Sequence, residues 1–131
     1  MNSVTINIEV EVNPTEDPEK VKSAVQNIFS YSFLESIPRR RGSLLIIKGE
    51  GKEGLNKFYA LIKQERILNA AQKIMFKGLK GNSITFYLNK QAAYVKHISF
   101  CNPVGESTLG PIKVEISCDN PEELIYWLTS K

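Results

Sequence analysis

Basic side chains interleaved with tyrosines are the residues of this sequence that suggest a chemistry. Lysine and arginine can neutralise phosphates, and an exposed tyrosine can stack on an unpaired base. This combination predicts RNA binding, although a solvated basic face that only keeps the protein soluble has the same composition. The candidate RNA-binding residues are Arg39, Arg40, Arg41, Lys90, Lys96, Tyr87 and Tyr94.

Residues that commonly carry catalysis are sparse. The sequence has a single histidine, His97, and no GxSxG, HExxH or Walker pattern. His97, Cys101 and Cys118 could supply three zinc ligands, but a fourth is missing and the spacing matches no known zinc finger. We therefore expect no enzyme, no metal site and no cofactor. The two cysteines are expected to be thiols in a reducing compartment rather than a disulfide.

Two glycine patterns resemble ligand-binding loops. Gly49–Gly54 reads GxGxxG between an expected strand and an expected helix, but its two glutamates would repel a pyrophosphate. No acid follows at the distance of about twenty residues where a ribose is usually held. Gly78–Gly81 matches the GxxG loop of KH domains, yet that loop joins two helices and this one leads into a strand. Plain glycine turns are favoured at both positions.

Charge is distributed unevenly along the chain. Between Pro38 and Phe100 there are thirteen lysines and arginines and three glutamates, a balance of +10. The remaining residues hold four basic and eleven acidic side chains, a balance of −7, which leaves the net charge of +3. A positive middle between acidic ends suits a polyanionic partner better than an evenly mixed surface does.

Strands are predicted wherever apolar and polar residues alternate. Residues 4–12, 83–88 and 112–116 alternate strictly, and the apolar run Leu44–Ile47 is typical of a central strand. Residues 82–100 predict a strand, a polar turn at 89–91 and a second strand. Residues 31–37 fit either a short strand or a turn.

Helices are predicted near 18–30, 55–77 and 121–129, where apolar residues recur at helical spacing, and the 55–77 region fits either two helices or one continuous helix. Together these elements predict a single domain, residues 1–131, of the α+β class. It should be a two-layer sandwich, with a mainly antiparallel mixed sheet of five or six strands and helices on one face. The other face must be exposed because it carries glutamates and lysines.

Four segments together resemble a known family. They are LNKQAA at 88–93, NPTEDPEKV at 13–21, RILNAAQKI at 66–74 and LGPIKVEI at 109–116. Over nearly its whole length the chain is similar to small, mostly archaeal proteins described as uncharacterised or as predicted exosome subunits. The resemblance implies a fold similar to the ribosomal large-subunit protein that contacts 5S RNA. The chain departs from that family where Asn69 and Gln72 replace an acid and an arginine.

The expected function is non-catalytic RNA binding, in association with RNA processing as the resemblance implies. The alternative is a protein–protein interaction module, or a homodimer formed through the exposed sheet face or an edge strand, without nucleic-acid binding. The sequence has no run of about 18 apolar residues and no basic-then-apolar leader. We therefore expect a cytoplasmic protein with no membrane partner.

Overall fold

The computed structural model describes residues 3–101 and 110–130. Its strands form one sheet in the order β2-β3-β1-β7-β5-β4, and β6 pairs with β5. Every described pairing is antiparallel. The strands are β1 (Val4–Val12), β2 (Phe33–Pro38), β3 (Ser43–Glu50), β4 (Leu79–Lys80), β5 (Ser83–Asn89), β6 (Phe100–Cys101) and β7 (Pro111–Cys118).

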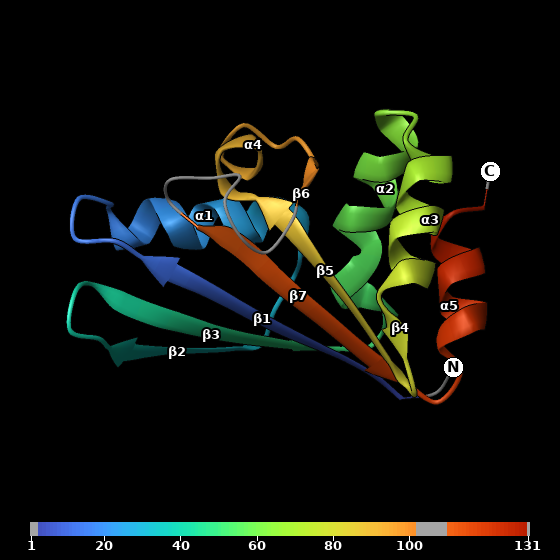
Figure 1. The fold of residues 1–131 in the computed structure, drawn as a ribbon, viewed down its shortest axis with the longest axis horizontal. Helices are drawn as coiled ribbons and strands as arrows, with labels where there is room; N and C mark the ends of the chain where they lie inside the picture. The colour runs from blue at the N-terminus through green and yellow to red at the C-terminus, as the bar shows by residue number, and fades with distance from the viewer. Residues whose placement is uncertain (1–2, 102–109, 131) are drawn as a thin grey trace.

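All helices pack on one face of this sheet, which confirms the predicted two-layer α+β fold (Figure 1). In Figure 1, α2, α3 and α5 stand together at the β4 end, and α1 and α4 lie toward the other end. The helices are α1 (Pro18–Ile28), the 3-10 turn η1 (Lys52–Leu55), α2 (Asn56–Gln64), α3 (Leu68–Lys77), α4 (Lys90–Tyr94) and α5 (Pro121–Leu128).

Period-two alternation determines which sheet face is buried. Along β1 the apolar residues from Val4 to Val12 are buried, while the intervening polar residues are half-buried or exposed. The centre of the core is aromatic: the Phe58 ring stacks on Phe29 at 5.3 Å and on Phe86 at 5.5 Å between ring centroids. These rings join α1, α2 and β5, so the helices are positioned on the sheet by large apolar side chains.

The structure differs from the sequence predictions within residues 82–100, where the predicted second strand is reduced to β6 at Phe100–Cys101 and residues 95–99 form no strand. The helical region predicted near 55–77, which fitted two helices or one continuous helix, contains two, because Arg66 adopts a left-handed backbone (φ 59°) between α2 and α3. The polar turn predicted at 89–91 is instead the start of α4, since the Asn89 side chain accepts a hydrogen bond of 3.0 Å from the N–H of Ala92. Residues 31–37, left open by the pattern, contain the edge strand β2.

Both glycine patterns have packing roles in the structure. A Cβ on Gly49 would lie 2.8 Å from the carbonyl oxygen of Ser30, so the glycine lets the chain after α1 approach β3. A Cβ on Gly78 would overlap the carbonyl oxygen of Thr85. Gly78 thus permits the tight passage from α3 into the β4–β5 hairpin, and neither pattern needs a ligand to explain it.

Candidate nucleic-acid interface

Most basic side chains in the middle of the chain lie on the surface without a carboxylate partner. Of the thirteen lysines and arginines between residues 38 and 100, only Lys90 forms a salt bridge with a carboxylate within the described part of the chain. Eleven of the other twelve are exposed, and Lys52 is half-buried. Their positive charge is therefore not neutralised by ion pairs with the protein's own acids.

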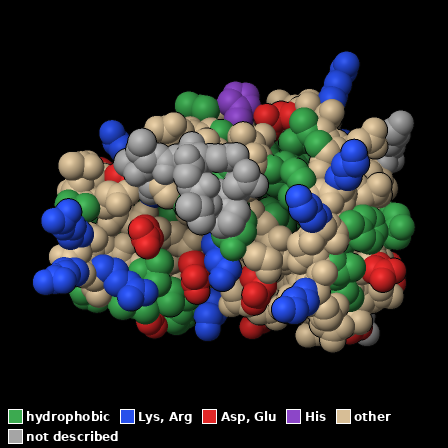
Figure 2. All heavy atoms as spheres, viewed as in Figure 1, with side chains coloured by type: hydrophobic (Ala, Val, Ile, Leu, Met, Phe, Trp, Pro, Cys, Tyr) green, Lys and Arg blue, Asp and Glu red, His purple; other side chains and the backbone are tan. Residues whose placement is uncertain are grey.

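These cations form two main groups. One is the β2–β3 turn with its three consecutive arginines, which we call the arginine turn. The second group, the helical cations, lies on η1, α2, α3, their connections and β4. Figure 2 shows lysine and arginine side chains at both of these ends of the visible face. The helical cations are Lys52, Lys57, Lys63, Arg66, Lys73, Lys77 and Lys80.

The arginine turn is built by the residues that flank it. Pro38 ends β2 opposite Ser43, the first residue of β3. The N–H of Arg39 donates to the carbonyl oxygen of Gly42 at 3.1 Å, which closes the turn, and Gly42 adopts the left-handed backbone that glycine tolerates (φ 83°). Arg39–Arg41 are all exposed. A short hairpin thus presents three guanidinium groups to solvent.

Lys90 does not lie on the predicted basic surface, which corrects the sequence prediction. Its side chain is fully buried, with 0% exposure. Its Nζ donates to the carbonyl oxygen of Glu11 at 2.6 Å and to the Glu16 carboxylate at 3.0 Å. The Tyr94 hydroxyl donates to the same carboxylate at 3.1 Å. Lys90 and Tyr94 therefore join α4 to the β1–α1 connection, and the buried Lys90 ammonium is not available to a phosphate.

The electrostatics of this buried cluster agree with a structural role. Burial alone would raise the pKa of the Glu16 carboxyl, but hydrogen bonds from Asn13 and Lys90 outweigh it and lower the pKa below its ordinary value of 4.5. Burial, and to a smaller extent the hydrogen bond to Glu16, raises the pKa of Tyr94 to about 12. Glu16 thus stays charged and Tyr94 neutral at physiological pH.

The lowered pKa of Glu16 predicts an acid-sensitive stability. The folded protein stabilises the charged form of Glu16 more than the unfolded chain does. The contribution of Glu16 to the free energy of unfolding is therefore complete above pH 4.5 and is lost as pH falls through the lower pKa of the folded state. The difference in free energy of unfolding between the wild type and Glu16→Gln should therefore shrink as pH falls below 4.5. Urea unfolding at a series of pH values measures it, and a difference independent of pH would contradict the assignment.

The remaining predicted residues lie apart from the arginine turn. Tyr87 is half-buried on the open face of the sheet, opposite Lys113 of β7. Lys96 is exposed in the loop after α4, on the helix side. Figure 1 shows the β2–β3 turn and α4 at separate places in the fold. The seven predicted residues consequently do not form a single site.

The open sheet face is acidic. The outward-facing residues of β2, β3, β1 and β7 lie opposite one another in the strand pairing. They carry more carboxylates than ammonium groups. A phosphate chain laid across this face would meet net repulsion. The charged residues of these four strands are Glu9, Glu11, Glu35, Glu50 and Glu115 against Lys48 and Lys113.

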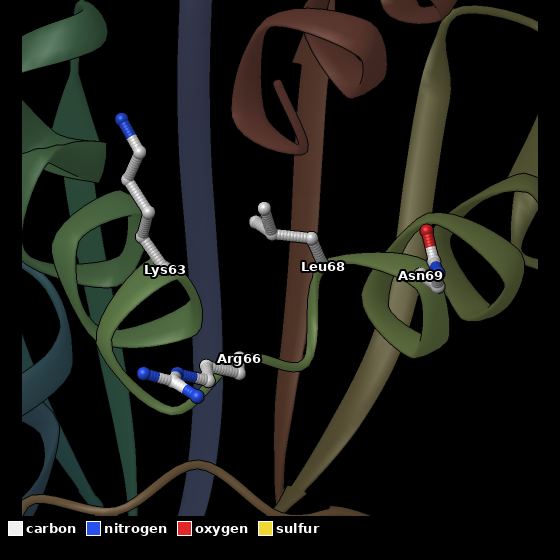
Figure 3. A pocket seen from close by; sticks show the side chains of 4 residues that line it. All are labelled: Lys63, Arg66, Leu68 and Asn69. Atoms are coloured by element: carbon white, nitrogen blue, oxygen red, sulfur yellow. The ribbon is translucent and has the colours of Figure 1, made fainter. Parts of the chain in front are cut away.

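A cleft with two basic residues at its walls lies between α2 and α3 and was missing from the predicted site. Its volume is about 310 Å³, and it is lined by Lys63, Arg66, Leu68 and Asn69. Figure 3 shows Lys63 projecting from α2, Arg66 from the connection and Leu68 from the start of α3. The sequence shows that three of these residues are basic or polar, but the cleft depends on the left-handed turn at Arg66 that separates α2 from α3.

The cysteines and the histidine do not assemble. Cys101 pairs opposite Tyr87, whereas Cys118 lies at the other end of β5, one residue beyond the pairing of Ser83 with Ser117. That separation of five positions along a strand corresponds to about 17 Å, which is too far for a disulfide. Burial raises the pKa of the Cys118 thiol. His97 Nδ1 instead lies 3.2 Å from the Glu65 carboxylate.

Comparison with known proteins places this fold in a family. A family model described as RNA binding matches residues 5–118. A UPF0201 protein of Sulfurisphaera tokodaii is 47% identical over 124 residues, which cover 95% of this chain and 86% of that protein. The chain belongs to the UPF0201 family. A second UPF0201 relative, from Saccharolobus solfataricus, is 38% identical over 130 residues. The aligned residues cover 98% of this chain and 88% of that protein.

The UPF0201 assignment agrees with the three-dimensional structure. A crystal structure of the UPF0201 protein from Methanococcus jannaschii superposes with a TM-score of 0.85 at 33% identity, over 95% of this chain and 98% of that one. These relatives confirm the resemblance to a family of archaeal proteins. Among the described residues, no helix is both long and apolar enough to cross a bilayer.

Proposed function

We propose that this UPF0201 protein is a non-catalytic RNA-binding protein whose contacts are made by the arginine turn and the helical cations. The observation that carries the proposal is the set of twelve basic side chains that have no salt bridge within the described residues. Unpaired surface cations attract a polyanion and release its counterions on binding. The RNA-binding description of the matching family model supports RNA as that polyanion.

The distribution of charge favours these two groups over the open sheet face. The sheet face carries five glutamates against three lysines, Lys48, Lys80 and Lys113, so its net charge repels phosphates. The arginine turn and the α2–α3 cleft carry Arg39–Arg41, Lys63 and Arg66 in exposed positions. Lys96 adds a further exposed cation on the helix side. Phosphates therefore find their partners at the turn and over the helices.

Salt dependence tests the arginine turn. Each phosphate neutralised on single-stranded RNA contributes roughly 0.7 to the slope of log affinity against log salt, so replacing Arg39, Arg40 and Arg41 by alanine should flatten the slope by about two. Fluorescence anisotropy of a labelled RNA, titrated at several salt concentrations, measures the slope. The fold should persist, because the three side chains are exposed in a turn.

A matched triple variant separates local contacts from net charge. Lys20, Lys22 and Lys113 lie outside both cation groups, and replacing all three by alanine removes the same three charges. This control should keep most of the wild-type slope. Equal slopes for both triple variants would show that only net charge matters, and an absence of binding by the wild type at low salt would overturn the proposal.

Association with an RNA-processing assembly and pairing of two copies both stay predictions. Recovery of protein partners from native lysate, with and without RNase treatment, would test the first. Partners that remain after RNase digestion support direct protein contact, whereas their complete loss indicates that they are bridged by RNA. The molar mass measured by light scattering across a concentration series tests self-association.

A further inference from the structure

Two stacked aromatic rings and two lysines from η1, α2 and α5 lie next to one another on the helix side. The Nζ of Lys52 lies 5.0 Å from the centroid of the Trp127 ring. The Trp127 ring stacks on Tyr59 with 5.1 Å between centroids and 16° between planes. The Nζ of Lys63 lies 5.1 Å from the Tyr59 centroid and donates to its hydroxyl at 3.2 Å. We call these four residues the lysine–aromatic stack.

The two lysines of the lysine–aromatic stack are not needed to pack the helices together. Contact between Tyr59 and Trp127 is enough to attach α5 to α2, since both rings are half-buried against the core. Lys52 adds a charge over the Trp127 ring and Lys63 adds one beside the Tyr59 hydroxyl, and neither forms a salt bridge within the described residues. Positive charge together with aromatic rings on a surface is what single-stranded nucleic-acid sites combine.

We propose that the lysine–aromatic stack is a subsite for an unpaired base of single-stranded RNA. The base replaces Lys52 on the Trp127 ring, and the displaced ammonium contacts an adjacent phosphate. This inference rests on the proposed function and names the form of RNA that is bound. The exchange is favourable because a base stacked on an aromatic ring contributes more than an exposed cation–π contact, and the lysine gains a phosphate in return.

The surroundings of the stack fit an RNA strand that continues past the base. Lys63 belongs both to the stack and to the α2–α3 cleft, where Arg66 lines the same cleft. Phosphates next to the stacked base can therefore meet Lys63 and Arg66 in succession. Of the carboxylates in η1 and α5, Glu123 accepts a hydrogen bond of 2.9 Å from Asn120, and Glu53 lines a hollow with Thr5 and Glu50.

The experiment uses Trp127, the single tryptophan of the chain, as its own reporter. Two labelled RNAs of equal length are compared, one oligoadenylate and one abasic, which have the same phosphates but differ in bases. Anisotropy gives the affinity of each, and tryptophan emission reports stacking on the ring. We expect both RNAs to bind, oligoadenylate to bind about tenfold more tightly, and oligoadenylate alone to quench the emission.

Three variants assign the base-dependent affinity to the ring. Trp127→Leu should lose the preference for oligoadenylate over the abasic RNA, while Trp127→Phe, which keeps a ring, should retain most of it. Tyr126→Leu is the matched control, because Tyr126 lies on the same helix, is 58% exposed and contacts Phe76 outside the stack. It should behave as the wild type.

The outcomes separate this inference from the proposed function. Equal affinity of the wild type for both RNAs, without quenching, would overturn the base subsite and leave phosphate binding intact. Failure of both RNAs to bind would overturn both proposals. Circular dichroism shows whether Trp127→Leu remains folded, and if it does not, quenching of the wild type by oligoadenylate but not by the abasic RNA still decides the question.

Discussion

Replacing Lys90 by alanine is expected to lower the free energy of unfolding by about 3–5 kcal/mol, the usual cost of removing one partner from a buried ion pair. Glu16 would then stay in the interior, with its side chain only 6% exposed, without its cation. The carbonyl oxygen of Glu11 would lose its 2.6 Å hydrogen bond as well. Urea unfolding followed by circular dichroism measures the change.

Two further variants identify the cause of that loss. Lys96→Ala removes the same charge from an exposed position six residues later, so its effect should stay within about 0.5 kcal/mol. Lys90→Met keeps the apolar stem and removes only the ammonium, so most of the destabilisation should persist. If Lys90→Ala were no worse than Lys96→Ala, the buried ion pair would not be a stabilising contact of this fold.

Lys90 also shows where sequence patterns stop being informative. Asn89, Lys90 and Gln91 are all polar, so their local pattern predicts an exposed turn. The partner that allows Lys90 to be buried is Glu16, which is 74 residues away in the sequence. A contact of that separation leaves no periodicity in either segment. The predicted RNA-binding lysine is consequently a structural residue.

The lysine–aromatic stack was missed for a related reason. Tyr59 and Trp127 fall within two separate predicted helices, and their rings meet only in the folded structure, where α2 and α5 both contact α3. By contrast, the strands of the sheet and their buried face follow from strict alternation, which requires no distant partner. The arginine turn was equally accessible from the sequence, since Pro38 and Gly42 delimit it locally.

Replacing Phe58 by alanine is the second change with a large expected effect, again about 3–5 kcal/mol, because it leaves a cavity where a fully buried phenyl ring was. Phe58 lies between Phe29 of the α1 end and Phe86 of β5, with ring planes within 20° and 19° of parallel. The cavity would therefore interrupt the contacts that hold α2 on the sheet. Urea unfolding measures the loss.

The functional consequence of Phe58→Ala follows from the position of its neighbour. Tyr59 is the next residue of α2, so a loosened helix should also disturb the contact between Tyr59 and Trp127 and change the tryptophan emission of the folded protein. Phe33→Ala is the matched control, since Phe33 is 45% exposed on the edge strand β2, and its substitution should cost less than about 1 kcal/mol. Equal losses for the two variants would contradict a core centred on Phe58, and unchanged emission in Phe58→Ala would show that α5 holds Trp127 without help from α2.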